Sequence, residues 1–303
     1  MQENLDRVVL SFNQESLMLL NACIAFIMFG VALELKIEHF KYLLKKPKAI
    51  LIGLLSQLVL LPMLTFILVL LLNPSPSIAL GMMLVAACPG GNVSNFYTSL
   101  SNGNVALSVS LTAITSSIAF LSTPFNFTFW ANQHEPTAAI LREVQLNVMD
   151  VVFTVIFILV IPLVLGMWVN SRYPNTTFKI AKPIKRLSII IFAAFVVGAL
   201  SANFDHFANY VFNFLFVVLI HNALALTTGF SLAKSLGLGS AEIRSITIET
   251  GIQNSGLALV IIFQYFDGLG GMAIIAAWWG VWHLISGAVI SWQWSSRPKL
   301  VMP

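Results

Sequence analysis

The sequence is poor in charge and in cysteine. Of its 303 residues, 16 are Lys or Arg and 12 are Asp or Glu, so charged residues make up 9%, whereas a soluble domain carries about a quarter. Apolar residues make up 58%. These proportions exclude an ordinary soluble globular protein. The two cysteines are too few for a disulfide framework, and no CxxC or HxxxH pattern indicates a zinc or haem site.

The basic residues do not form the kind of cluster that binds nucleic acid. The formal net charge is +4, but the Lys and Arg residues lie between long apolar runs, where they indicate membrane topology. We therefore expect the lipid bilayer as a partner, no nucleic acid and no obligatory protein partner.

Nine apolar runs are long enough to cross the hydrocarbon of a bilayer, which takes about 20 helical residues. The chain is thus predicted to be an all-α polytopic membrane protein with nine transmembrane helices. The first 16 residues are polar, with acidic residues where a signal peptide is basic, so we expect a mature external tail. The predicted spans are 17–35, 48–72, 77–100, 105–130, 145–169, 184–202, 208–233, 243–266 and 270–295.

The basic residues also predict orientation, because cytoplasmic loops are enriched in Lys and Arg. With the amino terminus outside and the carboxyl terminus cytoplasmic, Arg7 and Arg142 are the only external basic residues. A miscounted span would destroy this asymmetry. We expect a multi-pass protein of the cell membrane, inner or plasma, in this orientation. The predicted cytoplasmic basic residues are Lys36, Lys41, Lys45, Lys46, Lys48, Arg172, Lys179, Lys182, Lys185, Arg186, Lys234, Arg244, Arg297 and Lys299.

Two of the predicted spans contain residues that interrupt a helix. The third holds CPGGNVSN, in which Pro89 precedes two glycines, and the eighth holds ETGIQNSG, which begins at Glu249. Proline removes a helix hydrogen bond, and freed backbone groups at membrane depth are tolerated only where protein or water satisfies them. A packing motif is the alternative for the first break, since small residues let helices approach closely. Two such breaks together favour a functional site.

The two breaks lie five spans apart, which indicates an internal repeat. Because five is odd, a second copy of a five-span repeat is upside down relative to the first. This is the geometry of inverted-repeat secondary transporters, whose site lies where two broken helices cross near the midplane. Two complete repeats need ten spans, so the first repeat here lacks its opening helix.

Glu249 is the only acidic residue near the middle of a predicted span. A lone carboxylate in hydrocarbon is costly unless it is paired or coordinated. One interpretation is a protonated side chain bonded to a neighbouring helix. The other is a cation ligand, because the surrounding residues offer hard oxygen atoms, which suit sodium rather than a transition metal. The first predicted sodium site consists of Ser94, Asn95, Ser108, Thr112 and Glu249.

A second cation site can share the same carboxylate. Gln253 lies one turn after Glu249, and Gln57 is a polar residue in the apolar second span. For the hydroxyl residues of both sites the alternative is a bond to their own helix. The second predicted sodium site consists of Gln57, Glu249, Gln253 and the unwound carbonyls of Thr250 and Ile252.

Each half-helix that begins at a break presents free N–H groups and a positive dipole end, which attract anions. A carboxylate or sulfonate is therefore expected there. His283 of the ninth span is a candidate neighbouring donor, with packing as the alternative, and His221 and Asn222 receive the weaker role of joining helices. The predicted substrate-binding residues are Gly91, Asn92, Asn254 and His283.

These motifs resemble the bile acid:sodium symporter family. The matching segments are CPGGNVSN at 88–95, GNVALSVSLTAITS at 103–116, ETGIQNSGLA at 249–258 and VWHLISG at 281–287, with LKKPKAILIGLLSQ leading to Gln57. The resemblance implies symport of an organic anion, bile acid-like or a smaller carboxylate, with two sodium ions as coupling ions and alternating access. Carried over by position, it implies the same residues for both sodium sites, and Asn92, Asn254 and His283 for the substrate.

The resemblance also implies a core domain, in which the broken helices cross, and a panel domain. The core would comprise spans at about 48–130 and 208–295, and the panel those at about 17–35, 145–169 and 184–202, within one transporter unit of residues 1–303. Bacterial members commonly have ten spans, whereas here the first is missing, as in the animal members. The panel would then have three helices.

Other functions fit the residues less well. A proton-coupled or uncoupled organic anion carrier would keep the fold and lose the role of sodium. An intramembrane hydrolase lacks support, because the sequence has no GxSxG or HExxH pattern, so no enzymatic activity and no catalytic residue are expected. A channel suits two inverted breaks less well than an occluded site does.

Overall fold

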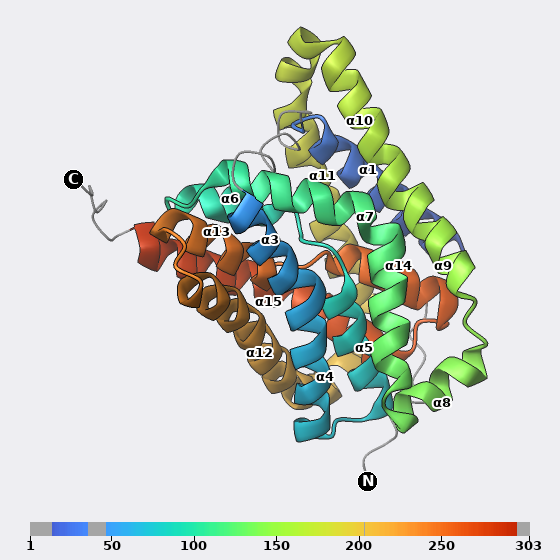
Figure 1. Cartoon of the computed structure of the whole chain (residues 1–303). Helices are drawn as coiled ribbons and strands as arrows, with labels where there is room; N and C mark the ends of the chain where they lie inside the picture. The colour runs from blue at the N-terminus through green and yellow to red at the C-terminus, as the bar shows by residue number, and fades with distance from the viewer. Residues whose placement is uncertain (1–13, 36–46, 203, 296–303) are drawn as a thin grey trace.

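The computed structural model describes residues 14–35, 47–202 and 204–295, and every regular element in these ranges is a helix (Figure 1). Some side chains, most of them between 182 and 213, are outside the description. Five of the described segments are long and apolar enough to cross a membrane, which agrees with the predicted all-α membrane protein. These segments are Pro47–Leu72, Val105–Asn132, Val148–Arg172, Phe214–Ser235 and Gly270–Ser295.

Short connections join the helices along the chain. The first group of elements is α1 (Gln14–Ala32), α3 (Pro47–Leu55), the π-helical turn η2 (Ser56–Leu60), α4 (Leu61–Leu72), α5 (Pro76–Ala87), α6 (Val93–Leu100) and α7 (Val105–Asn132). The second is α8 (Glu135–Val144), α9 (Val148–Val155), the π-helical turn η3 (Ile156–Val160), α10 (Ile161–Arg172), α11 (Pro174–Ala202), α12 (Phe204–Ser235), α13 (Ser240–Gly251), α14 (Ser255–Tyr265) and α15 (Gly270–Ser295).

Two helices are interrupted at the predicted positions. The first break separates α5 from α6, and the second separates α13 from α14. The four half-helices have 12, 8, 12 and 11 residues, and none of these lengths spans a hydrocarbon core of about 30 Å. The unwound residues between the half-helices, from Cys88 to Gly91 and at Ile252 and Gln253, are buried.

A π-helical turn precedes a proline in two of the long helices. In η2 the Leu61 N–H reaches back five residues to the Ser56 carbonyl, and Pro62 follows. The same arrangement recurs in η3, which Pro162 follows. Proline lacks an N–H and its ring crowds the carbonyl four residues earlier, so a wider turn relieves both problems. The first of these turns also carries the buried Gln57.

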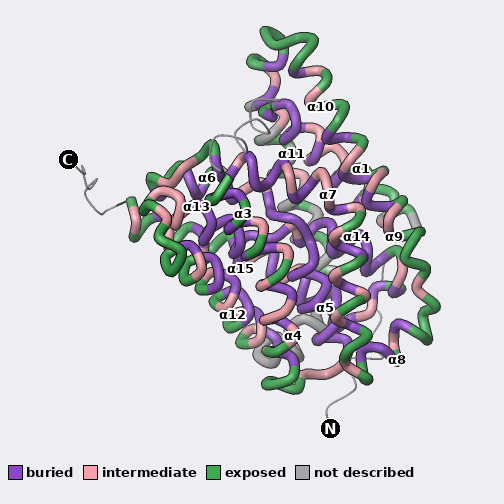
Figure 2. Tube along the Cα trace, in the orientation of Figure 1, coloured by how far each residue is buried: buried purple, intermediate pink, exposed green. Residues whose placement is uncertain are grey.

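The helix α5 lies in the interior of the described structure. Its residues from Ser77 to Ala87 are all buried, as the purple trace in Figure 2 shows. It packs against α4, α7 and α15. Gly81 permits a close approach to α15, because a Cβ atom there would lie 2.9 Å from the Met272 Cα. This packing holds the first break inside protein rather than lipid.

The helices α1, α10 and α11 form a second group, and α10 and α11 rise together at the top of Figure 1. Gly166 of α10 lies against α1, where an added Cβ would be 2.7 Å from the Phe29 carbonyl oxygen. The helix α1 also contacts α14, and α9 contacts α7 and α14. The ranges predicted for the panel fall in this group and in α9, while the division into two domains stays a prediction.

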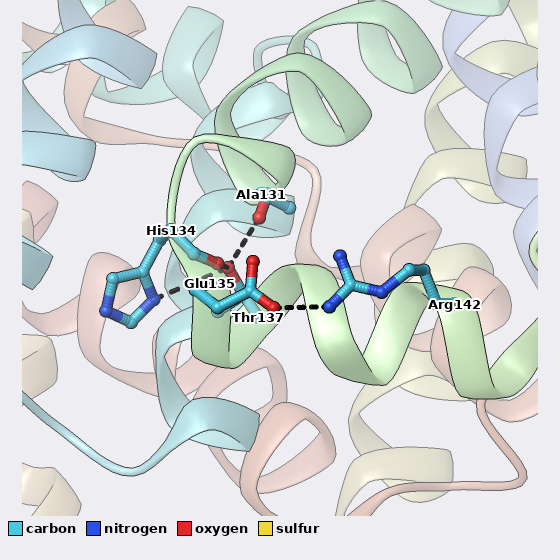
Figure 3. Close-up of polar contacts among 5 residues, drawn as sticks. All are labelled: Ala131, His134, Glu135, Thr137 and Arg142. Atoms are coloured by element: carbon cyan, nitrogen blue, oxygen red, sulfur yellow. Dashed lines mark hydrogen bonds and ion pairs between the residues drawn. The ribbon is translucent and has the colours of Figure 1, made fainter.

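The helix α8 is an element that the search for spans did not predict. It has ten residues and is amphipathic, whereas that search required about 20 apolar residues. Figure 3 shows the corner at its start, where the Thr137 hydroxyl donates to the Ala131 carbonyl at 2.6 Å. Arg142 pairs with Glu135 at 2.5 Å, and an exposed pair of this kind contributes at most about 1 kcal/mol. The buried corner therefore positions α8 more than the ion pair does.

The helix α11 begins at Pro174, well before the predicted start near 184. The prediction began the span after a run of basic residues, because charge is costly in hydrocarbon, but Lys and Arg are good helix formers and belong to the same helix. The orientation of the chain stays a prediction. Several of the basic residues that predict this orientation lie outside the described residues, namely Arg7, Lys36, Lys41, Lys45, Lys46, Arg297 and Lys299.

The close approach at Gly81 predicts a loss of stability on substitution. Gly81→Ala places a carbon against backbone atoms of Met272, which cannot rotate away. We expect a lower melting temperature in detergent, corresponding to about 1–3 kcal/mol. Gly198→Ala is the control, because nothing lies within 4 Å of the added carbon there. Equal melting temperatures for the two variants would contradict this packing of α5 on α15.

Candidate functional site

The two helix breaks meet in the protein interior and pair through their backbones. The Gly91 N–H donates to the Ile252 carbonyl at 2.7 Å, and the Asn254 N–H donates to the Pro89 carbonyl at 2.8 Å. The unwound segments form an antiparallel bridge. Backbone groups that leave a helix must find other partners, since an unpaired buried group is costly. Each break therefore supplies partners that the other break needs.

The local sequence explains why each helix stops. Pro89 has no N–H to continue α5, and Cys88 before it is extended, with φ −69° and ψ 154°, as residues preceding proline prefer. At the second break the Asn254 side chain caps α14 by accepting the Leu257 N–H at 3.1 Å. Both breaks thus follow from ordinary backbone chemistry.

Glu249 lies near the end of α13, with only 1% of its surface exposed. Three hydroxyl groups point at its carboxylate. The donors and their distances are Ser94 of α6 at 2.5 Å, Ser108 of α7 at 2.9 Å and Thr112 of α7 at 2.6 Å. The structure therefore brings these predicted ligands together around one carboxylate.

The Ser108 hydroxyl lies between two acceptor oxygens beside Glu249. The Ser108 hydroxyl lies 2.8 Å from the Asn95 side-chain oxygen and 2.9 Å from Glu249, yet it has one proton to donate. The Thr112 hydroxyl is also 3.5 Å from the Asn95 oxygen. A cation bound among these atoms would use the lone pairs that these hydrogen bonds leave. The donor set consists of hard oxygen atoms and fits sodium.

The second predicted group also meets at the crossing. The Gln57 amide donates to the Gln253 side chain at 3.4 Å, and Gln253 donates to the Thr250 carbonyl at 2.8 Å. The Gln57 side-chain oxygen is buried without a hydrogen-bond partner, which is costly for an acceptor. The Ile252 carbonyl accepts one N–H and keeps a second lone pair. A cation beside Gln57 would satisfy its free oxygen.

Gly90 leaves open the space between these two groups. A Cβ atom there would overlap the Glu249 Oε1 and lie 2.9 Å from the Gln57 Nε2. Glycine at this position thus lets the Glu249 and Gln57 side chains approach the backbone closely, in addition to loosening the helix.

His221 and Asn222 of α12 have different roles. The Asn222 side chain donates to the Gly251 carbonyl at 2.8 Å, so it supports the end of α13 at the second break. The His221 ring lies 2.7 Å from the Thr65 hydroxyl and packs on Trp279, with ring centroids 4.7 Å apart. His221 therefore joins helices, whereas Asn222 also stabilises the unwound segment.

Two hydroxyl residues near the crossing were not predicted. Ser56 in η2 lies 2.9 Å from the Thr250 hydroxyl, and Thr98 of α6 donates to the Ser108 hydroxyl at 3.3 Å. Ser56 directly precedes the predicted ligand Gln57, and Thr98 follows the predicted ligand Ser94 by one helical turn. Polar neighbours of predicted ligands within apolar spans were the available signal.

The predicted substrate residues come together only in part. The Gly91 N–H is already used in the pairing of the breaks. The Asn92 and Asn254 amides share one side of the crossing, since they lie 3.6 Å and 3.8 Å from the Met28 sulfur. His283 is buried and its Nδ1 has no partner, and no described hydrogen bond joins it to either asparagine.

Comparison of the sequence with known proteins identifies the family of the chain. A sequence model of the sodium bile acid symporter family matches residues 21–210. The sodium-dependent transporter YocS of Bacillus subtilis is 31% identical over 273 residues, which are 90% of this chain and 82% of that protein. The chain belongs to the sodium bile acid symporter family. The resemblance seen in the motifs is thereby confirmed.

More distant members extend this comparison. The probable sodium/metabolite cotransporter BASS1 of Oryza sativa, a chloroplast protein, is 29% identical over 276 residues, 91% of this chain and 65% of that protein. The P3 protein of Homo sapiens is 26% identical over 234 residues, 77% of this chain and 48% of that protein. The chain therefore spans less than two thirds of these two relatives.

Family membership gives the general function of the molecule. It is a multi-pass membrane protein of a family of sodium-dependent transporters, with sodium as the coupling ion and a small molecule as the substrate. The oxygen-rich surroundings of Glu249 are compatible with sodium.

The space at Gly90 predicts a change in sodium binding. Gly90→Ala places a methyl group between Glu249 and Gln57, so we expect the apparent sodium affinity to fall by about tenfold or more. Tryptophan fluorescence titrated with sodium at constant ionic strength measures this affinity. Gly198→Ala should bind sodium as the wild type does, and an unchanged affinity in Gly90→Ala would contradict the placement of sodium at the crossing.

Proposed function

We propose that the protein imports an organic anion together with two sodium ions by alternating access. The observation that carries this proposal is the buried Glu249 carboxylate, which lies beside two paired helix breaks and within a cage of side-chain oxygens. A carboxylate in this position is costly without a cation, so sodium binding and the structure of the crossing depend on each other.

The first sodium ion binds within the cage around Glu249. The contacts of Ser108 with both Asn95 and Glu249 support this site, because one hydroxyl proton cannot serve two acceptors. The proposed ligands are Ser94, Asn95, Ser108, Thr112 and Glu249.

The second sodium ion binds on the other side of the same carboxylate. The unpartnered oxygen of Gln57 and the space left by Gly90 support this site. The proposed ligands are Gln57, Glu249, Gln253 and the carbonyls of Thr250 and Ile252, although the Ile252 carbonyl shares its oxygen with a backbone N–H.

The anion binds where the half-helices α6 and α14 begin. Their first turns direct positive dipole ends toward the crossing. Two sodium ions beside one carboxylate leave a net charge of +1, which a monovalent anion neutralises. The anion and the ions therefore stabilise each other's binding, which is the requirement for coupling. The proposed substrate residues are Asn92, Asn254 and His283, together with the backbone near Gly91.

The proposed transport motion separates a core from a panel. The core comprises the spans that bear the crossing, α3 to α7 and α12 to α15, and the panel comprises α1, α9 with α10, and α11. We further propose nine membrane spans in inverted repeats, with the amino terminus outside and the carboxyl terminus in the cytoplasm of a cell membrane. The boundary between these two groups includes the contacts of α1 and α9 with α14.

Two sodium ions supply enough free energy for accumulation. A tenfold sodium gradient contributes about 1.4 kcal/mol per ion and a potential of about 100 mV contributes roughly 2.3 kcal/mol per charge, so two ions supply about 7.4 kcal/mol. Moving a monovalent anion against the potential costs about 2.3 kcal/mol. The remaining free energy of about 5 kcal/mol allows accumulation of several thousandfold.

The test uses Glu249→Gln in proteoliposomes, with uptake of radiolabelled taurocholate, pyruvate and pantoate under an inward sodium or potassium gradient. The amide keeps the shape of the side chain and loses its charge. We expect the apparent sodium affinity to fall by roughly 100-fold or more, because a carboxylate attracts a cation at about 4 Å by roughly 4 kcal/mol at an effective dielectric constant near 20.

Glu135→Gln is the matched control, since Glu135 lies exposed on α8 and pairs only with Arg142 among the described residues. It should transport as the wild type does. Uptake by the wild type that follows a proton gradient and ignores sodium would contradict the proposal, as would sodium-driven uptake in Glu249→Gln with the apparent sodium affinity of the wild type.

A further inference from the structure

Met28 of α1 is in contact with both helix breaks. Its side chain is buried, with 1% of its surface exposed. The amide nitrogens of Asn92 and Asn254 lie 3.6 Å and 3.8 Å from its sulfur. These asparagines stand at the first turns of α6 and α14, 162 positions apart in the sequence. One thioether from a third helix therefore receives a donor from each break.

Both amide nitrogens face the sulfur, and for Asn254 the cap of α14 explains this orientation. The Asn254 oxygen accepts the Leu257 N–H at 3.1 Å as the cap of α14, so its nitrogen must point away from that helix. The Asn92 oxygen is buried and has no hydrogen-bond partner. The Met28 sulfur is the one described acceptor for either amide nitrogen, so both donors converge on one atom.

A thioether sulfur is a weak acceptor for two amide donors. A carboxylate or sulfonate oxygen is a stronger one, because hydrogen bonds to an ionised acceptor are shorter and stronger than bonds to neutral groups. The methionine side chain is also unbranched and has three rotatable bonds, so it can leave this position while α1 stays in place. The two asparagines would then be better satisfied by an anion than by Met28.

We propose that the Met28 sulfur occupies the position at which an acceptor oxygen of the transported anion binds, so that Met28 competes with the substrate and sets the affinity of the site. This inference rests on the proposed function, and it means that Met28 controls the access of the anion to the proposed binding site. Met28 belongs to α1 and the two asparagines belong to the broken helices, so entry of the anion exchanges a contact between these two groups of helices for a contact with substrate.

A packing role for Met28 makes a different prediction. Met28 also belongs to the main apolar cluster of the described residues, and a side chain that only fills space is replaced equally well by others of its size. Leucine and glutamine are both close to methionine in volume, but only glutamine offers a strong acceptor oxygen. Met28→Gln and Met28→Leu therefore separate competition from packing.

The experiment measures KM for whichever of taurocholate, pyruvate and pantoate the wild type transports, in proteoliposomes at saturating sodium. In Met28→Gln a carbonyl oxygen can accept both asparagine amides and persistently occupy the anion position. We expect its KM to exceed that of Met28→Leu by about tenfold. A ratio below about fivefold would overturn the inference. Both variants should bind sodium, in the absence of anion, with wild-type affinity.

Met28→Leu alone provides the test if the glutamine variant does not fold. Removing the competing acceptor should lower KM to about half of the wild-type value or less, whereas a packing role leaves KM unchanged or raises it. The proposed function is tested separately by the wild type. If the wild type transports none of the three anions, the proposed function fails. If it transports one and the two variants have equal KM values, only the role of Met28 fails.

Discussion

The backbone pairing between the two helix breaks is the interaction on which the rest of the site depends. Proline and glycine stop two helices at membrane depth, where a free peptide group costs several kcal/mol. Gly90 and Gln253 resolve this cost by forming an antiparallel bridge, flanked by two short hydrogen bonds. Neither break is stable there without the other. The pairing also determines which side chains can approach each other, because it fixes the ends of four half-helices at one point.

The same pairing brings polar side chains together where the two helix breaks meet. Glu249 lies near the end of α13 and Ser94 near the start of α6, and the carboxylate receives further hydroxyl donors from α7. The π-helical turn η2 turns Gln57 toward the second break. Such turns are often found at functional sites, since they redirect one side chain without ending the helix. The residues proposed for sodium thus lie on helices that meet at the crossing, while the residues proposed for the anion lie at the ends of half-helices next to Met28.

Much of this site could be predicted from the sequence, because its strongest signals are local. Pro89 followed directly by two glycines disfavours a continuous helix, and Glu249 in an apolar run needs a partner. Other features depend on contacts between distant segments. The Gly91 N–H was expected to be free for an anion, but the opposite break uses it. Met28 is one apolar residue in an apolar helix, so no pattern distinguishes it. The helix α8 was missed because amphipathic segments of ten residues resemble loops to a search for spans.

The most direct test of sodium-coupled anion binding is the linkage between sodium and the anion at equilibrium. The dissociation constant of a transported anion is measured on purified wild-type protein while sodium replaces potassium at constant ionic strength. Two ions that bind together with the anion predict that this constant falls, with a slope of about two on logarithmic axes at low sodium. A dissociation constant that stays the same across the titration would show that sodium does not organise the crossing, and would contradict the coupled binding of sodium and the anion.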